Sequence, residues 1–325
     1  MHAAVLHTIG TVPRCEEFPE PLIVDPDREA IVHVHAASLK PVDKQLAGGS
    51  HYASRRELPC VCGSDGVGHL DDGRRVFFGG PRPPHGAMAQ RTVVPRAFTF
   101  PVPENVSDET AAALPNPGIS AWLALSNRAK LAPGENVLIL GATGVTGKLA
   151  VRIAKLLGAA RVVAAGRNQE VLNSLHDLGA DATISLALPA DELADAFLRE
   201  AGQSGRQAGF QVVIDYVWGG PAEAFLAAIT RREFAAIQSE TRFVQVGESA
   251  APAITLPAAV LRSTAITIMG TAGIPPRDVL VDAFQQVMAH SEKGHLHIDT
   301  ERVPLADIEN AWQRDEPGRR LVIIP

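Results

Sequence analysis

The chain has 325 residues, of which 46% are hydrophobic and 20% are charged, and its net charge at pH 7 is −6. This composition is ordinary for a globular protein of about two domains. It excludes the strongly basic surface of a nucleic-acid-binding protein, and no uninterrupted apolar run approaches the ~20 residues of a membrane span. Three cysteines favour a reducing cytoplasm over a disulfide framework. The N-terminus MHAAVLHTIG lacks the features of a signal peptide.

The first hundred residues predict a β-rich domain. Short β-branched runs at 30–38, 74–80 and 90–95 are separated by glycine and proline, which is the pattern of short strands joined by turns. His33 and His35 fall on one face of the first of these strands, where they are expected to pack or to face solvent. The last stretch of the chain, from HLHIDTERVP to RRLVIIP, has the same character, so both ends are expected to build one domain.

From residue 136 onward, strands and helices alternate. The predicted strands are NVLIL (136–140), RVVAA (161–165), DATISL (181–186), FQVVIDYV (210–217), TRFVQVG (241–247) and AITIMG (265–270). Segments with helical periodicity fill the gaps between them. This alternation predicts a doubly wound parallel sheet with right-handed crossovers, inserted into the β-rich domain.

The stretch GATGVTG follows the first of these strands and predicts a phosphate-binding turn. Residues 142–147 match A-x-G-x-x-G, which is the dinucleotide fingerprint with alanine in place of its first glycine. Gly144 would let the backbone approach a pyrophosphate, and Gly147 would let the helix pack closely on the strand. The free amides and the dipole at the helix start favour an anion there.

The end of the second strand indicates which nucleotide binds. Sites for NAD usually carry an acidic residue there for the ribose 2′-hydroxyl, but this chain has Gly166, Arg167 and Asn168 and no acid from 161 to 169. A guanidinium pairs with a phosphate, whereas a carboxylate repels it. The sequence therefore predicts NADPH rather than NADH.

The whole pattern resembles the medium-chain dehydrogenase/reductase superfamily, in its zinc-free quinone oxidoreductase branch. The similarity extends over nearly the full length and rests on SLKPVDKQLAGG (38–49), GSDGVGHL (63–70), HGAMAQRTVVP (85–95), DETAAALP, GISAWLAL, LAPGENVLILGATGVTG and IAKLLGA. It implies an α/β protein with a GroES-like catalytic domain (1–117 and 272–325) and a Rossmann domain (118–271). It also implies a homodimer, which we expect to form through the edge strand AITIMG.

The resemblance implies no catalytic metal. Zinc-dependent relatives carry Cys and His where this chain has Lys40 and Ser64, and neither lysine nor serine is a normal zinc ligand. Relatives with a structural zinc have four closely spaced cysteines, whereas this chain has only Cys15, Cys60 and Cys62. Without a strong Lewis acid, electron-poor acceptors such as quinones, enones and enals are favoured.

Site residues also follow from the resemblance. The catalytic candidates are Lys40 as a donor to a carbonyl oxygen, Asp43 in the same polar segment, and Tyr52 as a proton or hydrogen-bond donor. The residues expected to contact the cofactor are Ser120, Ala142, Thr143, Gly144, Val145, Thr146, Gly166, Arg167, Asn168 and Gly247.

Two alternatives to a quinone reductase remain open. One is an NADPH-dependent enoyl or alkenal reductase, which reduces an activated double bond. The other is a non-catalytic NADPH-binding protein of the lens-crystallin or sensor type. The sequence does not choose among them, because the loops at about 45–60, 80–90 and 245–275 shape the substrate site.

Overall fold

The structure is a computed structural model that describes residues 1–51, 54, 57–203, 208–231, 240–271, 273, 275–315 and 318–325. The chain divides into two compact units, one of Met1–Asn116 with Phe284–Pro325 and one of Pro117–Ala283. The chain crosses between them within helices α3 (Pro115–Leu123) and α10 (Arg277–Glu292). From the sequence, we expected the second domain boundary between residues 271 and 272, whereas in the structure it lies inside α10. A boundary inside a helix has no turn residues that would mark it in the sequence.

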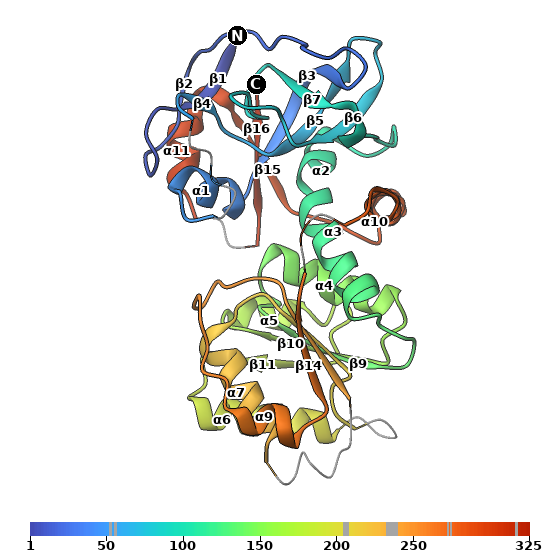
Figure 1. Cartoon of the computed structure of the whole chain (residues 1–325). Coiled ribbons are helices and arrows are strands. Elements are labelled where there is room, and N and C mark those ends of the chain that lie inside the picture. The colour runs from blue at the N-terminus through green and yellow to red at the C-terminus, as the bar shows by residue number, and fades with distance from the viewer. Residues whose placement is uncertain are drawn as a thin grey trace. The chain divides into compact units, whose positions relative to one another are not determined.

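The first unit is built on sheets from both ends of the chain. Its larger sheet has the order β15-β16-β3-β5-β6-β8, with β7 also paired to β3. These strands are β3 (Glu29–Leu39), β5 (Asp65–Leu70), β6 (Arg75–Gly79), β7 (Arg91–Pro95), β8 (Thr99–Pro101), β15 (Thr300–Pro304) and β16 (Arg320–Ile324). The antiparallel pairing of β16 with β3 joins the C-terminal segment to the N-terminal one, as Figure 1 shows.

A smaller sheet and short helices complete this unit. The sheet has the order β2-β1-β4 and consists of β1 (His2–Leu6), β2 (Arg14–Glu17) and β4 (Cys60–Val61). The helices are α1 (Pro41–Gly48), α2 (Asp108–Ala113) and α11 (Ile308–Gln313), with 3-10 turns η1 (Arg96–Phe98) and η3 (Leu305–Asp307). Helix α1 begins with Pro41 in its first turn and is capped after Gly48 by Gly49, whose φ of 76° is the left-handed conformation that suits glycine.

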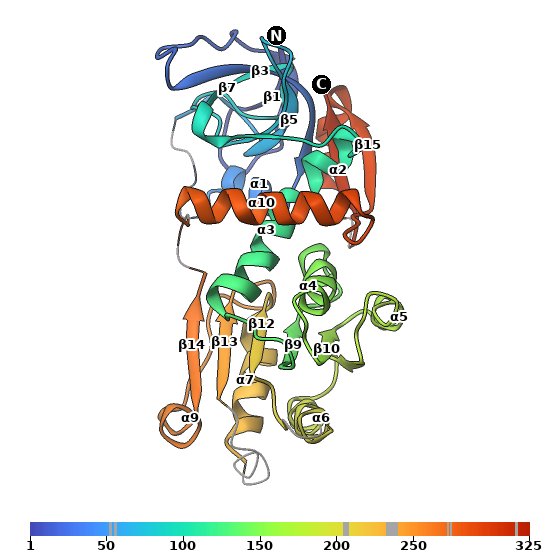
Figure 2. The same cartoon turned by 90° about the vertical axis from the view of Figure 1, so that its right-hand side faces the viewer.

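The described part of the second unit contains six parallel strands in the order β11-β10-β9-β12-β13-β14. The strands are β9 (Asn136–Leu140), β10 (Arg161–Gly166), β11 (Ala182–Ser185), β12 (Val212–Asp215), β13 (Thr241–Gln245) and β14 (Ile266–Gly270). Counted along the chain this is the order 3-2-1-4-5-6 of dinucleotide-binding sheets. Figure 2 shows β14, β13, β12, β9 and β10 side by side in this order, and the predicted doubly wound fold is confirmed.

Helices cover this sheet because its central strand is apolar on both faces. All five residues of β9 are buried. Leu138 and Leu140 pack in a core with Phe197 of α6 (Ala190–Gly202) and Phe225 of α7 (Gly219–Ile229). Further helices among the described residues are α4 (Val145–Leu156), α5 (Gln169–Ser174) and α9 (Ala258–Ser263), and the π-helical turn η2 (Ala124–Arg128) follows α3.

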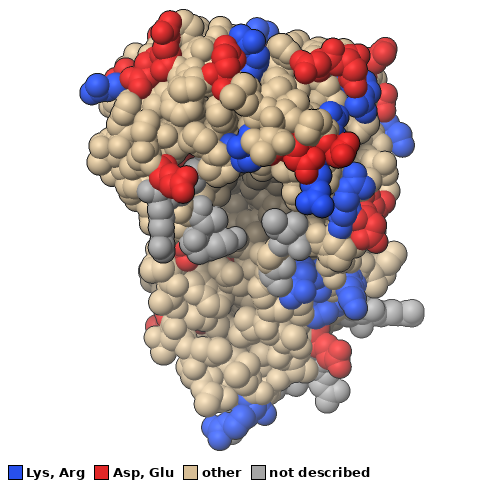
Figure 3. All heavy atoms as spheres, turned by 45° about the horizontal axis from the view of Figure 1, so that its top comes forward, with Lys and Arg blue, Asp and Glu red and all other residues tan. Residues whose placement is uncertain are grey.

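The surface carries charges of both signs. On the face in Figure 3, acidic and basic side chains are interspersed, as expected for a chain with 30 basic and 36 acidic residues. Among the described helices, none has the length and apolar character needed to cross a membrane.

Candidate functional site

The glycine-rich turn lies at the carboxyl end of β9, next to β10. Gly141 has a φ of 87°, and the backbone amides of Gly141 and Ala142 donate to the carbonyl of Ala165 at 2.9 and 2.8 Å. Gly144 is the N-cap of α4, so the amides of Val145 and Thr146 in the first turn have no acceptor within the helix. The turn therefore presents free N–H groups at the positive end of a helix dipole, where an anion binds well.

The two predicted glycine roles fit the packing of this turn. A Cβ on Gly147 would lie 2.3 Å from the carbonyl oxygen of Gly141 and 2.6 Å from Cα of Ala142, so only glycine lets α4 approach the turn. A Cβ on Gly144 would meet only the oxygen of Gly141, at 3.6 Å, and Gly144 itself is exposed. The backbone at Gly144 is thus open to a ligand.

The end of β10 contacts the same turn. A Cβ on Gly166 would lie 2.4 Å from Cγ2 of Thr143, so the glycine permits this close approach. Arg167 follows and is exposed, and no hydrogen bond or ion pair to another described residue engages its guanidinium. Asn168 caps α5 by accepting from the amide of Val171 at 3.0 Å, which leaves its side-chain NH2 as a donor.

At the end of β12, next to β9, lies a buried carboxyl that the sequence analysis missed. Asp215 is fully buried, and its Oδ1 accepts from the amides of Val217 and Trp218 at 2.8 and 2.9 Å. Its Oδ2 makes no hydrogen bond to a described residue. Burial raises the pKa of Asp215 to about 6, although the two amides oppose this shift. An acidic residue ending an apolar strand (FQVVID) was the available signal.

Asp215 also organises the neighbouring loop after β13. Its carbonyl accepts from the amides of Val246 and Gly247 at 2.8 and 3.1 Å. A Cβ on Gly247 would lie 2.8 Å from the carbonyl oxygen of Tyr216, so this predicted cofactor residue has to be small. In a sheet of this order ligands bind where the strand order reverses, beside β9 and β12. Ser120, another predicted contact, is half-buried in α3.

The first unit contains a cluster of buried charges around Lys40. The side chain of Lys40 is 1% exposed, and its ammonium lies 3.0 Å from Oδ2 of Asp43 and 3.0 Å from Oδ1 of Asp65. It also donates to the carbonyl oxygen of Ser38 at 2.9 Å. An ammonium has three protons, so these acceptors leave Lys40 none to donate to the carbonyl group of a substrate.

The electrostatics of this cluster keep the lysine charged. Burial by itself lowers the pKa of Lys40, but Asp43 and Asp65 outweigh it and raise that pKa above its ordinary value. Burial, together with Asp43, raises the pKa of Asp65 against the opposing effect of Lys40. Arg320 is also buried, and burial lowers its pKa. Asp65 and Arg320 escaped the sequence analysis, because single charged residues in apolar strands carry no spacing pattern.

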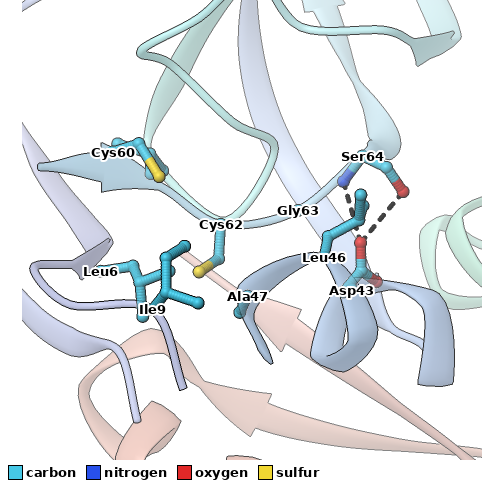
Figure 4. Close-up of a pocket in the computed structure, with 10 residues that line it drawn as sticks. Leu6, Ile9, Asp43, Leu46, Ala47, Cys60, Cys62, Gly63 and Ser64 are labelled. Atoms are coloured by element: carbon cyan, nitrogen blue, oxygen red, sulfur yellow. Dashed lines mark hydrogen bonds between the residues drawn. The ribbon is translucent and has the colours of Figure 1, made fainter. Parts of the chain in front are cut away.

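Asp43 links this cluster to a small pocket within the first unit. Oδ1 of Asp43 accepts from the amide of Ser64 at 3.1 Å and from its hydroxyl at 3.0 Å. Figure 4 shows these two bonds at one side of the pocket and the buried thiols of Cys60 and Cys62 at the other. The cavity measures about 50 Å³, and its apolar wall is formed by Leu6, Ile9, Leu46, Ala47 and Val61. Tyr52, the third predicted catalytic residue, lies outside the described residues.

Within the described ranges, no three or more His, Cys, Asp or Glu side chains are grouped as metal ligands would be. The resemblance implies that Lys40 and Ser64 stand at the positions where zinc-dependent relatives hold their metal. In this structure both side chains bond to aspartates. The donor set there includes a positively charged ammonium, which does not fit a cation. The absence of a catalytic metal stays a prediction that elemental analysis can test.

Comparisons with known proteins find relatives that are similar to this chain over both units. No family model matches the chain. A probable NADPH-dependent quinone reductase of Emericella nidulans is 27% identical, and the match covers all of both chains. Quinone oxidoreductase-like protein 2 of Bos taurus is 28% identical, over 79% of this chain and 73% of that protein. A 2-methylene-furan-3-one reductase of Solanum lycopersicum is 31% identical over 48% of this chain and 44% of that protein.

Solved structures of quinone oxidoreductases match this chain over its full length. The quinone oxidoreductase of Thermus thermophilus, which was also solved in complex with NADPH, has a TM-score of 0.72 and 27% identity, and all of both chains is covered. These similarities to quinone oxidoreductases agree with the resemblance to the zinc-free branch of the medium-chain dehydrogenase/reductase superfamily that the sequence indicates. A mycobacterial quinone oxidoreductase, at 22% identity and a TM-score of 0.83 over all of both chains, shows the same fold. These relatives support an oxidoreductase that uses NADPH.

Proposed function

We propose that this protein is an NADPH-dependent oxidoreductase that transfers a hydride to a quinone or a similar electron-poor acceptor. The observation that carries the proposal is an open turn at Gly144 beside the end of the next strand, where Arg167 is exposed and pairs with no described residue. The turn suits the pyrophosphate that both nicotinamide cofactors share. Arg167 suits the 2′-phosphate that only NADPH carries.

The other predicted cofactor residues have roles that follow from their positions. The backbone from Ala142 to Thr146 forms the turn and the start of α4, so amides rather than side chains would bind the pyrophosphate. Gly166 keeps the end of β10 against Thr143, which places Arg167 beside the turn. Ser120 and Gly247 are proposed to lie along the nicotinamide end of the cofactor.

The chemistry of the first unit favours an acceptor that needs little activation. Bound NADPH supplies a hydride from its nicotinamide ring, and the protein orients the partners and excludes water. Lys40 and Ser64 are not zinc ligands, so the chain's own residues provide no strong Lewis acid at that place. Quinones, enones and enals are already electron-poor and accept a hydride without one.

Lys40 and Asp43 are proposed as positioning residues of this site. Lys40 balances the two carboxylates, and Asp43 fixes the amide and the hydroxyl of Ser64 at the pocket wall. Because its pKa is raised, Lys40 stays protonated near neutral pH and is a poor general acid there. Tyr52 is proposed as the hydroxyl group that donates a hydrogen bond or a proton to the acceptor.

Reduction of an enone double bond is the second candidate. The Solanum lycopersicum relative is named for a methylene-furanone, which is an enone. A hydride added to the β-carbon of such a substrate leaves an enolate, which then takes a proton. The same cofactor site serves both reactions, so only the acceptor distinguishes them.

An acceptor panel separates these possibilities. Purified protein with NADPH would be given benzoquinone, a naphthoquinone, an alkenal and a cyclic enone, and loss of NADPH absorbance would be followed. Faster loss with the quinones supports the first proposal, and loss with the enone or the alkenal alone supports the second. Tight NADPH binding without turnover of any acceptor would identify a non-catalytic NADPH-binding protein.

The proposed assembly is a homodimer formed through β14. This strand is at one end of the sheet order, and among the described strands it pairs only with β13. An unpaired edge with apolar residues such as Ile266 and Ile268 is an aggregation risk that a two-fold partner removes. Light scattering at micromolar concentration should give twice the 34.4 kDa chain mass, and a monomer there contradicts the proposal. The proposed location is the cytoplasm, on the grounds of cysteine usage.

A further inference from the structure

Two histidines meet on the exposed side of the larger sheet of the first unit. His35 of β3 and His69 of β5 place Nε2 and Nδ1 3.1 Å apart, and their ring centroids are 4.5 Å apart. The ring of His35 is exposed and that of His69 is half-buried. Neither histidine belongs to the proposed cofactor turn or to the pocket beside Ser64.

A β-bulge in β3 brings the rings of His35 and His69 into contact. Val34 is opposite Gly68 and Ala36 is opposite Val67, so His35 is the extra residue in β3. A Cβ on Gly68 would lie 2.1 Å from the carbonyl oxygen of His33, which shows how closely the two strands approach beside the bulge. Bulges re-aim side chains and often occur next to functional sites.

An anchored carboxylate orients the first ring. Nδ1 of His35 lies 3.1 Å from Oδ2 of Asp108. The other oxygen of Asp108 accepts from Nε of Arg75 at 2.8 Å, and Arg75 also donates to the carbonyl oxygens of Pro103 and Val106. If Nδ1 of His35 carries the proton that is donated to Asp108, Nε2 presents its lone pair toward His69. In metal sites a carboxylate holds a ligating histidine in the same way.

We propose that His35 and His69 together bind one divalent transition-metal ion of the Zn²⁺, Ni²⁺ or Cu²⁺ type. Two imidazole nitrogens at about 2.0–2.1 Å from a tetrahedral metal are roughly 3.3 Å apart, which is close to the observed 3.1 Å. Imidazole is a preferred ligand of these ions. The ion enters from solvent, replaces the bond between the two rings, and keeps water in its other positions. Because only two protein side chains hold the ion, chelators can remove it readily.

The test is calorimetric titration of the full chain, stripped with a chelator, with Ni²⁺ and with Zn²⁺ alone. The wild type should bind one equivalent at this site. His69→Ala should weaken that binding at least tenfold. Asp108→Asn should weaken it by roughly 10- to 100-fold, the range for loss of a carboxylate that orients a metal ligand. Circular dichroism of each variant checks that it is folded.

Two control variants locate the binding. His33→Ala removes a neighbouring ring on the same strand that pairs with Asp71, so binding should persist. His290→Ala removes a histidine whose Nδ1 lies 3.1 Å from that of His295, and it should also leave the proposed binding intact. The inference is overturned if the wild type binds no metal, or if His69→Ala binds it as tightly as the wild type does.

Discussion

Replacing Arg167 with alanine should change the cofactor preference without disturbing the fold. Arg167 is exposed and makes no hydrogen bond to another described residue, so its removal breaks no hydrogen bond within the described part of the chain. A charge-assisted hydrogen bond to the 2′-phosphate contributes roughly 1.5–3 kcal/mol. The Kd for NADPH should therefore rise by about ten- to a hundredfold. The Kd for NADH should change little, because NADH has no 2′-phosphate.

Fluorescence titration of both cofactors with both proteins measures this difference. The matched control is Arg199→Ala, which removes an exposed guanidinium from the last turn of α6. That turn lies near the amino ends of the strands, because a crossover helix runs back along the sheet. Added salt should weaken NADPH binding to the wild type more than to Arg167→Ala. Equal losses of NADH and NADPH affinity in Arg167→Ala would refute the reasoning, since Arg167 would then support the fold.

Three other predictions concern buried groups. Lys40→Met should lower the free energy of unfolding by roughly 3–5 kcal/mol, because it leaves Asp43 and Asp65 buried without their main counter-charge. The control Lys44→Met loses one hydrogen bond to the carbonyl of Arg314 and should lower that free energy by only about 1 kcal/mol. Equal losses of the two variants in urea unfolding would contradict this prediction. The pKa of Asp215 is raised from 3.8 to about 6, so the folded state holds its proton more tightly and stability falls as pH rises from about 4 to 6. Asp215→Asn keeps an acceptor for the two amides and should remove this pH-dependent loss of stability, which is on the order of 2–3 kcal/mol. If the pH dependence of unfolding is the same in Asp215→Asn as in the wild type, the prediction is wrong. Chelator-treated protein should contain far less than one zinc per chain by elemental analysis, and a stoichiometric zinc that survives chelation would show that the residues around Lys40 do hold a metal.

Much of the fold was predictable because its signals are local and periodic. The run NVLIL and the turn GATGVTG predicted β9, α4 and their junction, and the structure has the turn with the packing expected at Gly147. The alternation of strands and helices predicted the parallel sheet. The AITIMG segment was predicted as a strand and is β14 at one end of the sheet order.

The charged cluster was harder to predict, because it is made by residues far apart in the chain. Lys40 and Asp43 are near one another in sequence, and both were singled out. The other two charged residues of the cluster, Asp65 and Arg320, come from β5 and β16, which only the completed sheet brings alongside β3. The sequence therefore predicted an accessible Lys40 that donates to a substrate, whereas the folded chain buries it among carboxylates.

The most direct test of the central claim is the rate of NADPH oxidation by the purified, chelator-treated protein with a quinone acceptor. We predict quinone-dependent loss of NADPH absorbance, a much lower kcat/KM with NADH, and a selective fall of the NADPH rate in Arg167→Ala. If NADPH binds tightly but its absorbance falls no faster with protein and quinone together than with quinone alone, the proposed quinone reductase activity is contradicted.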